Sequence, residues 1–150
     1  MRVFEVMTDH VDTVPATMSA GDAWALMRQR RIRHLVVTKG KDGLGILSDR
    51  DAGGRSGSAI RAQRIVADLM TAPAASVGPD DTVRTVAKLM RGRTIGCVPV
   101  VEHGRLVGIV TLSDLLDLLG RGIDRPARSE RPMATHRVAH KKRTSAPFGW

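Results

Sequence analysis

The chain has 150 residues and a formal net charge of +9, and 42% of its residues are hydrophobic but only 3% are aromatic. This length fits one ordinary domain or two very small ones, whose core must be built from aliphatic residues and methionine. The sequence has no apolar run long enough to cross a bilayer and no signal-peptide pattern at its start, and its single cysteine excludes an intrachain disulfide, so we expect a cytoplasmic protein.

The first part of the chain predicts a strand, a helix and a β-hairpin, in that order. Residues 13–15 form a short extended segment that ends at a proline. A helix is expected next, because Ser19 followed three residues later by Asp22 is typical of a capping box. The apolar runs HLVVT and LGIL, on either side of KGKDG, predict a hairpin over residues 34–47.

The segment after this hairpin is rich in glycine, serine and arginine. Gly53 and Gly54 are expected to cut short the helix that would follow the hairpin. Residues 52–64, AGGRSGSAIRAQR, are predicted to form a linker.

The second part of the chain predicts the same order of elements. An extended segment at residues 76–77 precedes a helix, for which a side chain within residues 80–82 is the expected cap. The runs CVPVV and LVGIV predict a hairpin over residues 97–110. The run SDLLDLL, residues 113–119, then predicts a helix that Gly120 closes.

These similarities reflect an internal repeat. A shift of 63 residues aligns 3–51 with 66–114 without a gap, and 13 of the 49 pairs are identical. Each copy reads as a β-α-β-β-α unit, which is too small to bury a good core by itself. We therefore predict an α/β (α+β) fold in which the two units pack sheet to sheet with pseudo-twofold symmetry, leaving two equivalent clefts between them.

Both copies carry the same ordered motifs, which resemble the CBS domain family. The motifs are Met-Thr, Val before a turn, an amphipathic helix ending in Met, Ile-x-x-(Leu/Val)-(Val/Pro)-Val, and Gly-Ile-x-(Ser/Thr)-x-x-Asp. A tandem of two resembles a CBS pair, or Bateman module. The resemblance implies a first domain over 7–64, which includes the predicted linker, a second over 70–126, and a basic tail over 127–150.

The resemblance implies a non-catalytic regulatory protein that requires no cofactor. Many relatives bind AMP, ADP, ATP or S-adenosylmethionine in the clefts, and the hydroxyl and acidic residues of the last motif contact phosphate and ribose. In this chain those positions are Ser48, Asp51, Thr111 and Asp114. A Ser/Thr-x-x-Asp sequence is also a capping box, so both roles stay open for all four residues.

The two copies differ just before the first strand of each hairpin. Some relatives place basic residues there to contact phosphate, and this chain has Arg33 and His34 in the first copy but Gly96 and Cys97 in the second. The resemblance therefore implies stronger phosphate binding by the first copy. The alternative is that Arg33 is solvated and that His34 packs at the end of a strand.

The positive charge is concentrated in the tail. Residues 1–120 contain 16 basic and 13 acidic residues, whereas residues 121–150 contain 8 and 2. The tail is predicted to be largely disordered. Its alternative functions are to solubilise the chain or to contact nucleic acid or another acidic surface, with the repeats as a scaffold.

The sequence also bears on the oligomeric state and on catalysis. Paired modules of this family commonly form dimers, so the resemblance implies a homodimer, with a further protein partner left open. The sequence contains no P-loop, nucleophile elbow, Rossmann glycine pattern or metal-binding helix motif, and its histidines lack zinc-ligand spacing. We therefore expect neither catalysis nor a metal site.

Overall fold

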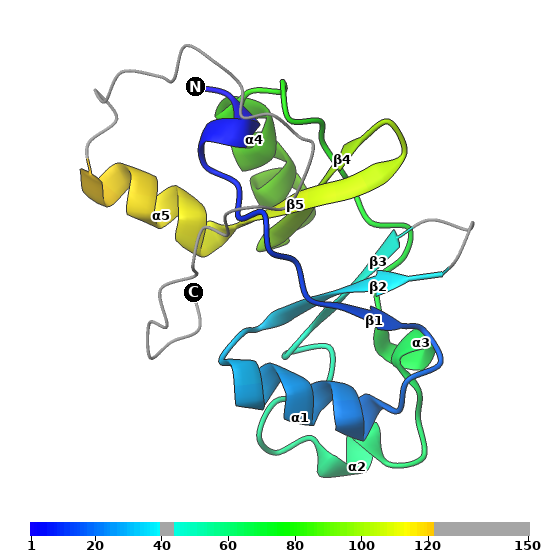
Figure 1. The fold of residues 1–150 in the computed structure, drawn as a ribbon. Coiled ribbons are helices and arrows are strands. Elements are labelled where there is room, and N and C mark those ends of the chain that lie inside the picture. The colour runs from blue at the N-terminus through cyan, green and yellow to red at the C-terminus, as the bar shows by residue number, and fades with distance from the viewer. Residues whose placement is uncertain (40–43, 122–150) are drawn as a thin grey trace. The chain divides into compact units, whose positions relative to one another are not determined.

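The computed structural model describes residues 1–39 and 44–121 (Figure 1). The tail predicted over 127–150 lies outside the described residues, as does the centre of the first hairpin turn, 40–43. The proposals for the tail therefore stay predictions.

The described residues form two compact units. Residues 12–39 and 44–74 form what we call the first-repeat unit. Residues 1–11 and 75–121 form the second-repeat unit.

The first-repeat unit is built around a three-stranded sheet with the strand order β1-β2-β3. Strand β1 runs parallel to β2, and β2 runs antiparallel to β3. The predicted α/β character is confirmed, and the elements in chain order are β1 (Thr13–Pro15), α1 (Ala20–Arg30), β2 (His34–Thr38), β3 (Leu44–Ser48), α2 (Ser58–Arg61) and α3 (Val66–Leu69).

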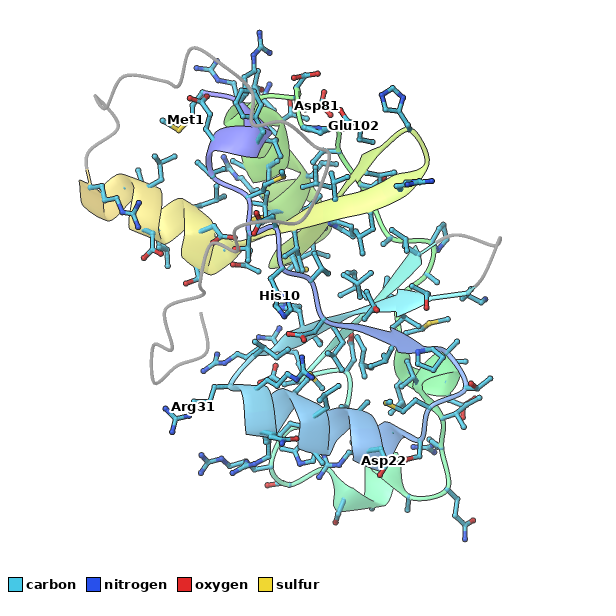
Figure 2. The ribbon with its side chains drawn as sticks, in the orientation of Figure 1. Met1, His10, Asp22, Arg31, Asp81 and Glu102 are labelled. Carbon is cyan, nitrogen blue, oxygen red and sulfur yellow. The ribbon has the colours of Figure 1, made fainter. Side chains whose placement is uncertain are left out.

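Helix α1 begins and ends with well-defined caps. The Oγ atom of Ser19 accepts a hydrogen bond from the backbone N–H of Asp22 at 3.0 Å, as the capping pattern predicted. The helix ends at Arg31, whose φ of 55° is left-handed, and Figure 2 shows Asp22 and Arg31 at opposite ends of the helix.

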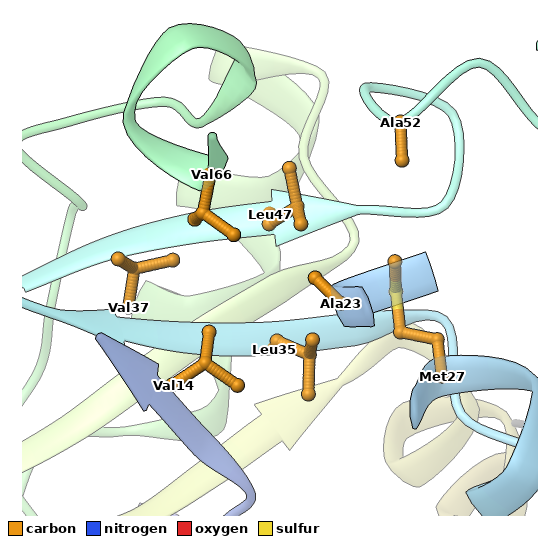
Figure 3. Close-up of a cluster of buried hydrophobic side chains, with 8 residues drawn as sticks. All are labelled: Val14, Ala23, Met27, Leu35, Val37, Leu47, Ala52 and Val66. Atoms are coloured by element: carbon orange, nitrogen blue, oxygen red, sulfur yellow. The ribbon is translucent and has the colours of Figure 1, made fainter. Parts of the chain in front are cut away.

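The core of this unit lies between the sheet and helices α1 and α3. Its side chains come from every strand of the sheet and from both helices, as Figure 3 shows. They are aliphatic residues and one methionine, as the low aromatic content predicted: Val14, Ala23, Met27, Leu35, Val37, Leu47, Ala52 and Val66.

The second-repeat unit contains a two-stranded antiparallel sheet of β4 and β5. Its buried core consists of Val3, Val77, Val86, Met90, Val98, Val100 and Val110. The elements are a 3-10 helix η1 (Val3–Glu5), α4 (Val83–Arg93), β4 (Cys97–Glu102), β5 (Arg105–Thr111) and α5 (Leu112–Arg121).

The extended segment at the start of each repeat differs between the units. In the first, the N–H of Val36 donates to the carbonyl of Asp12 at 3.2 Å and extends the pairing of β1 with β2. In the second, Pro99 stands at the position of Val36 and has no N–H to donate. Only an isolated parallel bridge between Val77 and Val100 remains there among the described residues.

The two repeats exchange the segments that precede them. Thr8 pairs with Ile109 of the second repeat through two backbone hydrogen bonds of 2.9 Å. Thr71 pairs in the same way with Ile46 of the first repeat. Within the compact units, the leading segment of each copy therefore supplies backbone pairing and core residues to the other copy. The domain bounds predicted over 7–64 and 70–126 stay predictions.

Residues 52–64 are packed, although their composition predicted a linker. Ala52 is fully buried and α2 lies within the segment. Gly57 lies so close to Gly53 that a Cβ on Gly57 would be only 2.4 Å from the Gly53 Cα atom. The glycines here allow close packing of two backbone segments rather than free movement.

Substitution Gly57→Ala is expected to lower the free energy of unfolding by about 2 kcal/mol. Gly57 has a φ of −97°, which alanine adopts without strain, so the cost comes from the contact with Gly53. The matched control is Gly21→Ala in α1, where a Cβ meets nothing within 4 Å and should stabilise the helix by up to about 1 kcal/mol. Urea unfolding of both variants checks this, and equal stabilities would show that the glycine contact is unimportant.

Candidate functional site

The first candidate site is the turn that follows β3. The backbone N–H of Ser48 donates to Oδ2 of Asp51 at 3.1 Å, and the N–H of Asp51 donates to Oγ of Ser48 at 2.9 Å. These two bonds have the reciprocal geometry of a capping box. The capping role that the sequence left open is therefore present at this position.

The chain after β3 follows a helical path for only one turn. The N–H of Ala52 donates to the carbonyl of Ser48 at 3.1 Å, and the N–H of Gly54 then donates to the carbonyl of Asp49 at 2.9 Å. Gly53 and Gly54 have φ angles of 90° and 63°, which favour glycine and end the helical path. The predicted interruption of the closing helix is confirmed.

Arg33 and His34 lie beside this turn. His34 is the register partner of Ser48 across β2 and β3, and the carbonyl of Arg33 accepts from the N–H of Asp49 at 2.9 Å. The Nε atom of Arg33 is 3.9 Å from Oδ2 of Asp49, and both side chains are more than a third exposed. A solvated pair this long contributes little to stability.

The structure therefore brings together the four predicted residues of the first copy. Ser48 and Asp51 are hydrogen-bonded to each other, and His34 is the register partner of Ser48. Arg33 lies beside Asp49 of the same turn.

The second candidate site, Thr111 and Asp114, is built differently. Oδ2 of Asp114 accepts from the N–H of Thr111 at 2.8 Å and from its Oγ1 at 3.2 Å. Oδ1 of Asp114 accepts from Oγ1 of Thr8 at 3.3 Å. Asp114 is 6% exposed, and Thr8 and Thr111 are each 1% exposed. Both carboxylate oxygens are thus used inside the protein.

The two sites differ in what their carboxylates leave for a ligand. Asp51 is half-buried, and among the residues that the structure describes nothing donates a hydrogen bond to its Oδ1. Thr71, the repeat equivalent of Thr8, is exposed instead of pairing with Asp51. The first site can accept hydrogen bonds from a ligand, whereas the second uses its acceptors for folding.

The sequence did not predict that Thr8 is part of the second site. Its signal was the Met-Thr pair that both copies share, which marks an equivalent position but not a contact. At the same site, Gly96 and Cys97 stand where the first copy has Arg33 and His34, and Cys97 is buried.

Neither a metal cluster nor a membrane span emerges from the described chain. Within residues 1–39 and 44–121, no three His, Cys, Asp or Glu side chains are grouped so that they could hold a metal ion. Over the same residues, every helix is too short or too polar to cross a bilayer.

Comparison with known proteins identifies relatives over most of the chain. The family model of the CBS domain matches residues 3–52 and 66–121. The CBS domain-containing protein YhcV of Bacillus subtilis is 32% identical over 114 residues, which are 75% of this chain and 81% of the relative. The inosine-5'-monophosphate dehydrogenase of Korarchaeum cryptofilum is 35% identical over 106 residues, which are 70% of this chain but 21% of the enzyme. This chain therefore spans about a fifth of the length of that enzyme.

A solved structure with the same fold contains bound ligands. The CBS domain pair of protein MJ0100, in complex with 5'-methylthioadenosine and S-adenosyl-L-methionine, is 26% identical to this chain. The alignment covers 81% of this chain and 97% of that chain, with a TM-score of 0.71.

Proposed function

This chain belongs to the CBS domain family, of which it carries two copies, and we propose that it is a non-catalytic regulatory protein that binds an adenosine-containing ligand at the Ser48–Asp51 turn. The observation that carries the proposal is Oδ1 of Asp51, to which none of the described residues donates a hydrogen bond. Ribose hydroxyls are donors that suit this oxygen. The ligands bound by the relative MJ0100 support the adenosine class.

The neighbouring residues give each part of such a ligand a partner. Asp51 accepts from the ribose hydroxyls while its Oδ2 keeps the bond to the N–H of Ser48. The Arg33 side chain, which is 42% exposed, meets a phosphate or a ligand carboxylate. His34, the register partner of Ser48, adds a second contact to phosphate.

In the same proposal the protein works as a cytoplasmic homodimer, and the ligand changes how it meets another chain. A ligand regulates in this way only when it binds two states of the protein with different affinities. The basic-tail alternative concerns residues outside the described part of the chain, and nothing in the described part favours it.

Substitution Asp51→Ala is expected to weaken ligand binding at least about tenfold, because one charge-assisted hydrogen bond contributes about 1.5–3 kcal/mol. Isothermal titration calorimetry with S-adenosylmethionine, 5'-methylthioadenosine, AMP, ADP and ATP measures this. The matched control is Asp68→Ala, which removes a carboxylate that caps α3 by accepting from the N–H of Ile65 at 2.9 Å. This control should bind like the wild type.

A second arm separates ribose from phosphate recognition. Arg33→Ala should weaken the binding of AMP, ADP and ATP. It should leave the binding of 5'-methylthioadenosine unchanged, because that compound has no phosphate. The proposed function is wrong if the wild type binds none of the five compounds, or if Asp51→Ala binds them as tightly as Asp68→Ala does.

A further inference from the structure

The turn that carries Asp51 lacks the support that its counterpart has. In the second repeat, Asp114 lies in the first turn of the ten-residue helix α5. In the first repeat, Gly53 and Gly54 end the helical path one residue after Asp51. The last carbonyls of a helical turn have no partner within it, so this short turn needs donors from elsewhere.

Arg61 of α2 supplies these donors. Its Nη1 atom donates to the carbonyl of Ala52 at 2.7 Å and to the carbonyl of Gly54 at 2.6 Å. The two carbonyls lie on either side of Gly53, so a single guanidinium nitrogen bridges the end of the turn. Hydrogen bonds from a charged donor are stronger than those between neutral groups.

The guanidinium also contacts Trp24 of α1. Its Cζ atom lies 4.4 Å from the centroid of the indole ring, which is the geometry of a cation–π contact. Trp24 itself packs against the buried core of the first-repeat unit. Arg28 also lies over this ring, at 5.6 Å. Helix α1, the Trp24 ring and the Arg61 guanidinium thus form a continuous series of contacts that reaches the turn.

We propose that Arg61 is a positioning residue that holds the Ser48–Asp51 turn in the conformation in which Asp51 binds its ligand. It takes the place of the helix that holds Asp114 in the second repeat. The part concerning the ligand rests on the proposed function, whereas the part concerning the turn does not. Arginine suits this role better than lysine, because only its flat guanidinium both stacks on an indole and donates along fixed directions.

The test compares Arg61→Met, Arg61→Lys and the matched control Arg64→Met. Arg64 donates from Nη1 to the carbonyl of Ile60 at 2.8 Å, within its own segment, so its loss should not affect the turn. Amide hydrogen exchange, followed by NMR, reports on the N–H groups of Ala52 and Gly54 without any ligand. Calorimetry with the ligands named above reports on Asp51.

We expect exchange at Ala52 and Gly54 to accelerate at least about tenfold in Arg61→Met, less in Arg61→Lys and not at all in Arg64→Met. Amides of β4 and β5 should be unchanged, which separates a local effect from general destabilisation. Ligand affinity should fall in the same order as the turn loosens. If Arg61→Met does not fold, the comparison of Arg61→Lys with Arg64→Met decides.

Two outcomes are distinguishable. Equal exchange at Ala52 in Arg61→Met and Arg64→Met overturns the role of Arg61, whatever the chain binds. Absence of ligand binding by the wild type overturns the proposed function, and the exchange rates still decide whether Arg61 holds the turn.

Discussion

Substitution Val3→Ala is expected to destabilise the second-repeat unit by about 2 kcal/mol, although Val3 stands at the start of the first repeat. Its side chain is fully buried among residues of the second repeat. Removing two buried methyl groups costs about 0.8 kcal/mol for each, and the cavity left behind adds to this. The backbone N–H of Val3 also donates to the carbonyl of Asp81 at 2.8 Å, so the segment stays in place and the cavity cannot close easily.

The other copy of the repeat provides a matched control for this prediction. Val66 is the repeat equivalent of Val3, is also fully buried, and lies in the core of the first-repeat unit. Val66→Ala should therefore destabilise the first-repeat unit by a similar amount.

Residue-resolved hydrogen exchange under native conditions measures the two effects separately. Val3→Ala should accelerate exchange in β4 and β5, and Val66→Ala should accelerate it in β2 and β3. Suppose instead that each substitution accelerated hydrogen exchange in the repeat to which it belongs in the sequence. The conclusion that each leading segment packs in the other repeat would then be wrong.

The sequence was sufficient to predict the repeat and the order of its elements, but not which copy each leading segment joins. Alternation and capping are local signals, so the hairpins and the start of α1 at Ser19 were found correctly. Thr8 and Thr71 look the same in either packing, because the two copies offer them equivalent partners. The choice depends on chain connectivity and on the fit of buried side chains, which a sequence pattern does not contain.

The segment over 52–64 shows a second limit of composition. Glycine and serine are typical of linkers, and that interpretation missed α2 and its contacts. Gly53 approaches Gly57 closely within this segment, and Arg61 contacts Trp24, which lies far from it along the chain. Here Gly53 and Gly57 permit close packing, and Arg61 donates hydrogen bonds to the carbonyls at the end of the Ser48–Asp51 turn.

The sequence predicted the candidate site residues as two equivalent pairs, but the two pairs differ in the structure. Ser48 and Asp51, like Thr111 and Asp114, form the reciprocal bonds that their spacing predicts. Burial separates them, because Thr8 closes over Asp114 while nothing equivalent covers Asp51 among the described residues. Ribose binding by Asp51 and Asp114 stays a prediction, and the geometry favours Asp51 for this role.

This difference predicts a large effect on stability at the second site. Asp114→Ala is expected to lower the free energy of unfolding by about 3 kcal/mol, because it leaves the buried donors of Thr8 and Thr111 without their acceptor. Asp51→Ala should cost only about 1 kcal/mol, the usual value of a cap, since water reaches the half-buried Ser48. Urea unfolding of both variants measures the difference, and equal losses would show that Thr8 does not make Asp114 structural.

A double-mutant cycle identifies the cause of the larger loss. Alone, Thr8→Val should destabilise the protein by about 1 kcal/mol, because Oδ1 of Asp114 loses a donor. In the background of Asp114→Ala the same substitution should instead raise stability, because it removes a buried hydroxyl that no longer has an acceptor. A change of sign of this kind is specific to a buried hydrogen-bonded pair. If Thr8→Val costs the same in both backgrounds, Asp114 is held by contacts other than Thr8, and Thr8 is not what distinguishes Asp114 from Asp51 as a ligand acceptor.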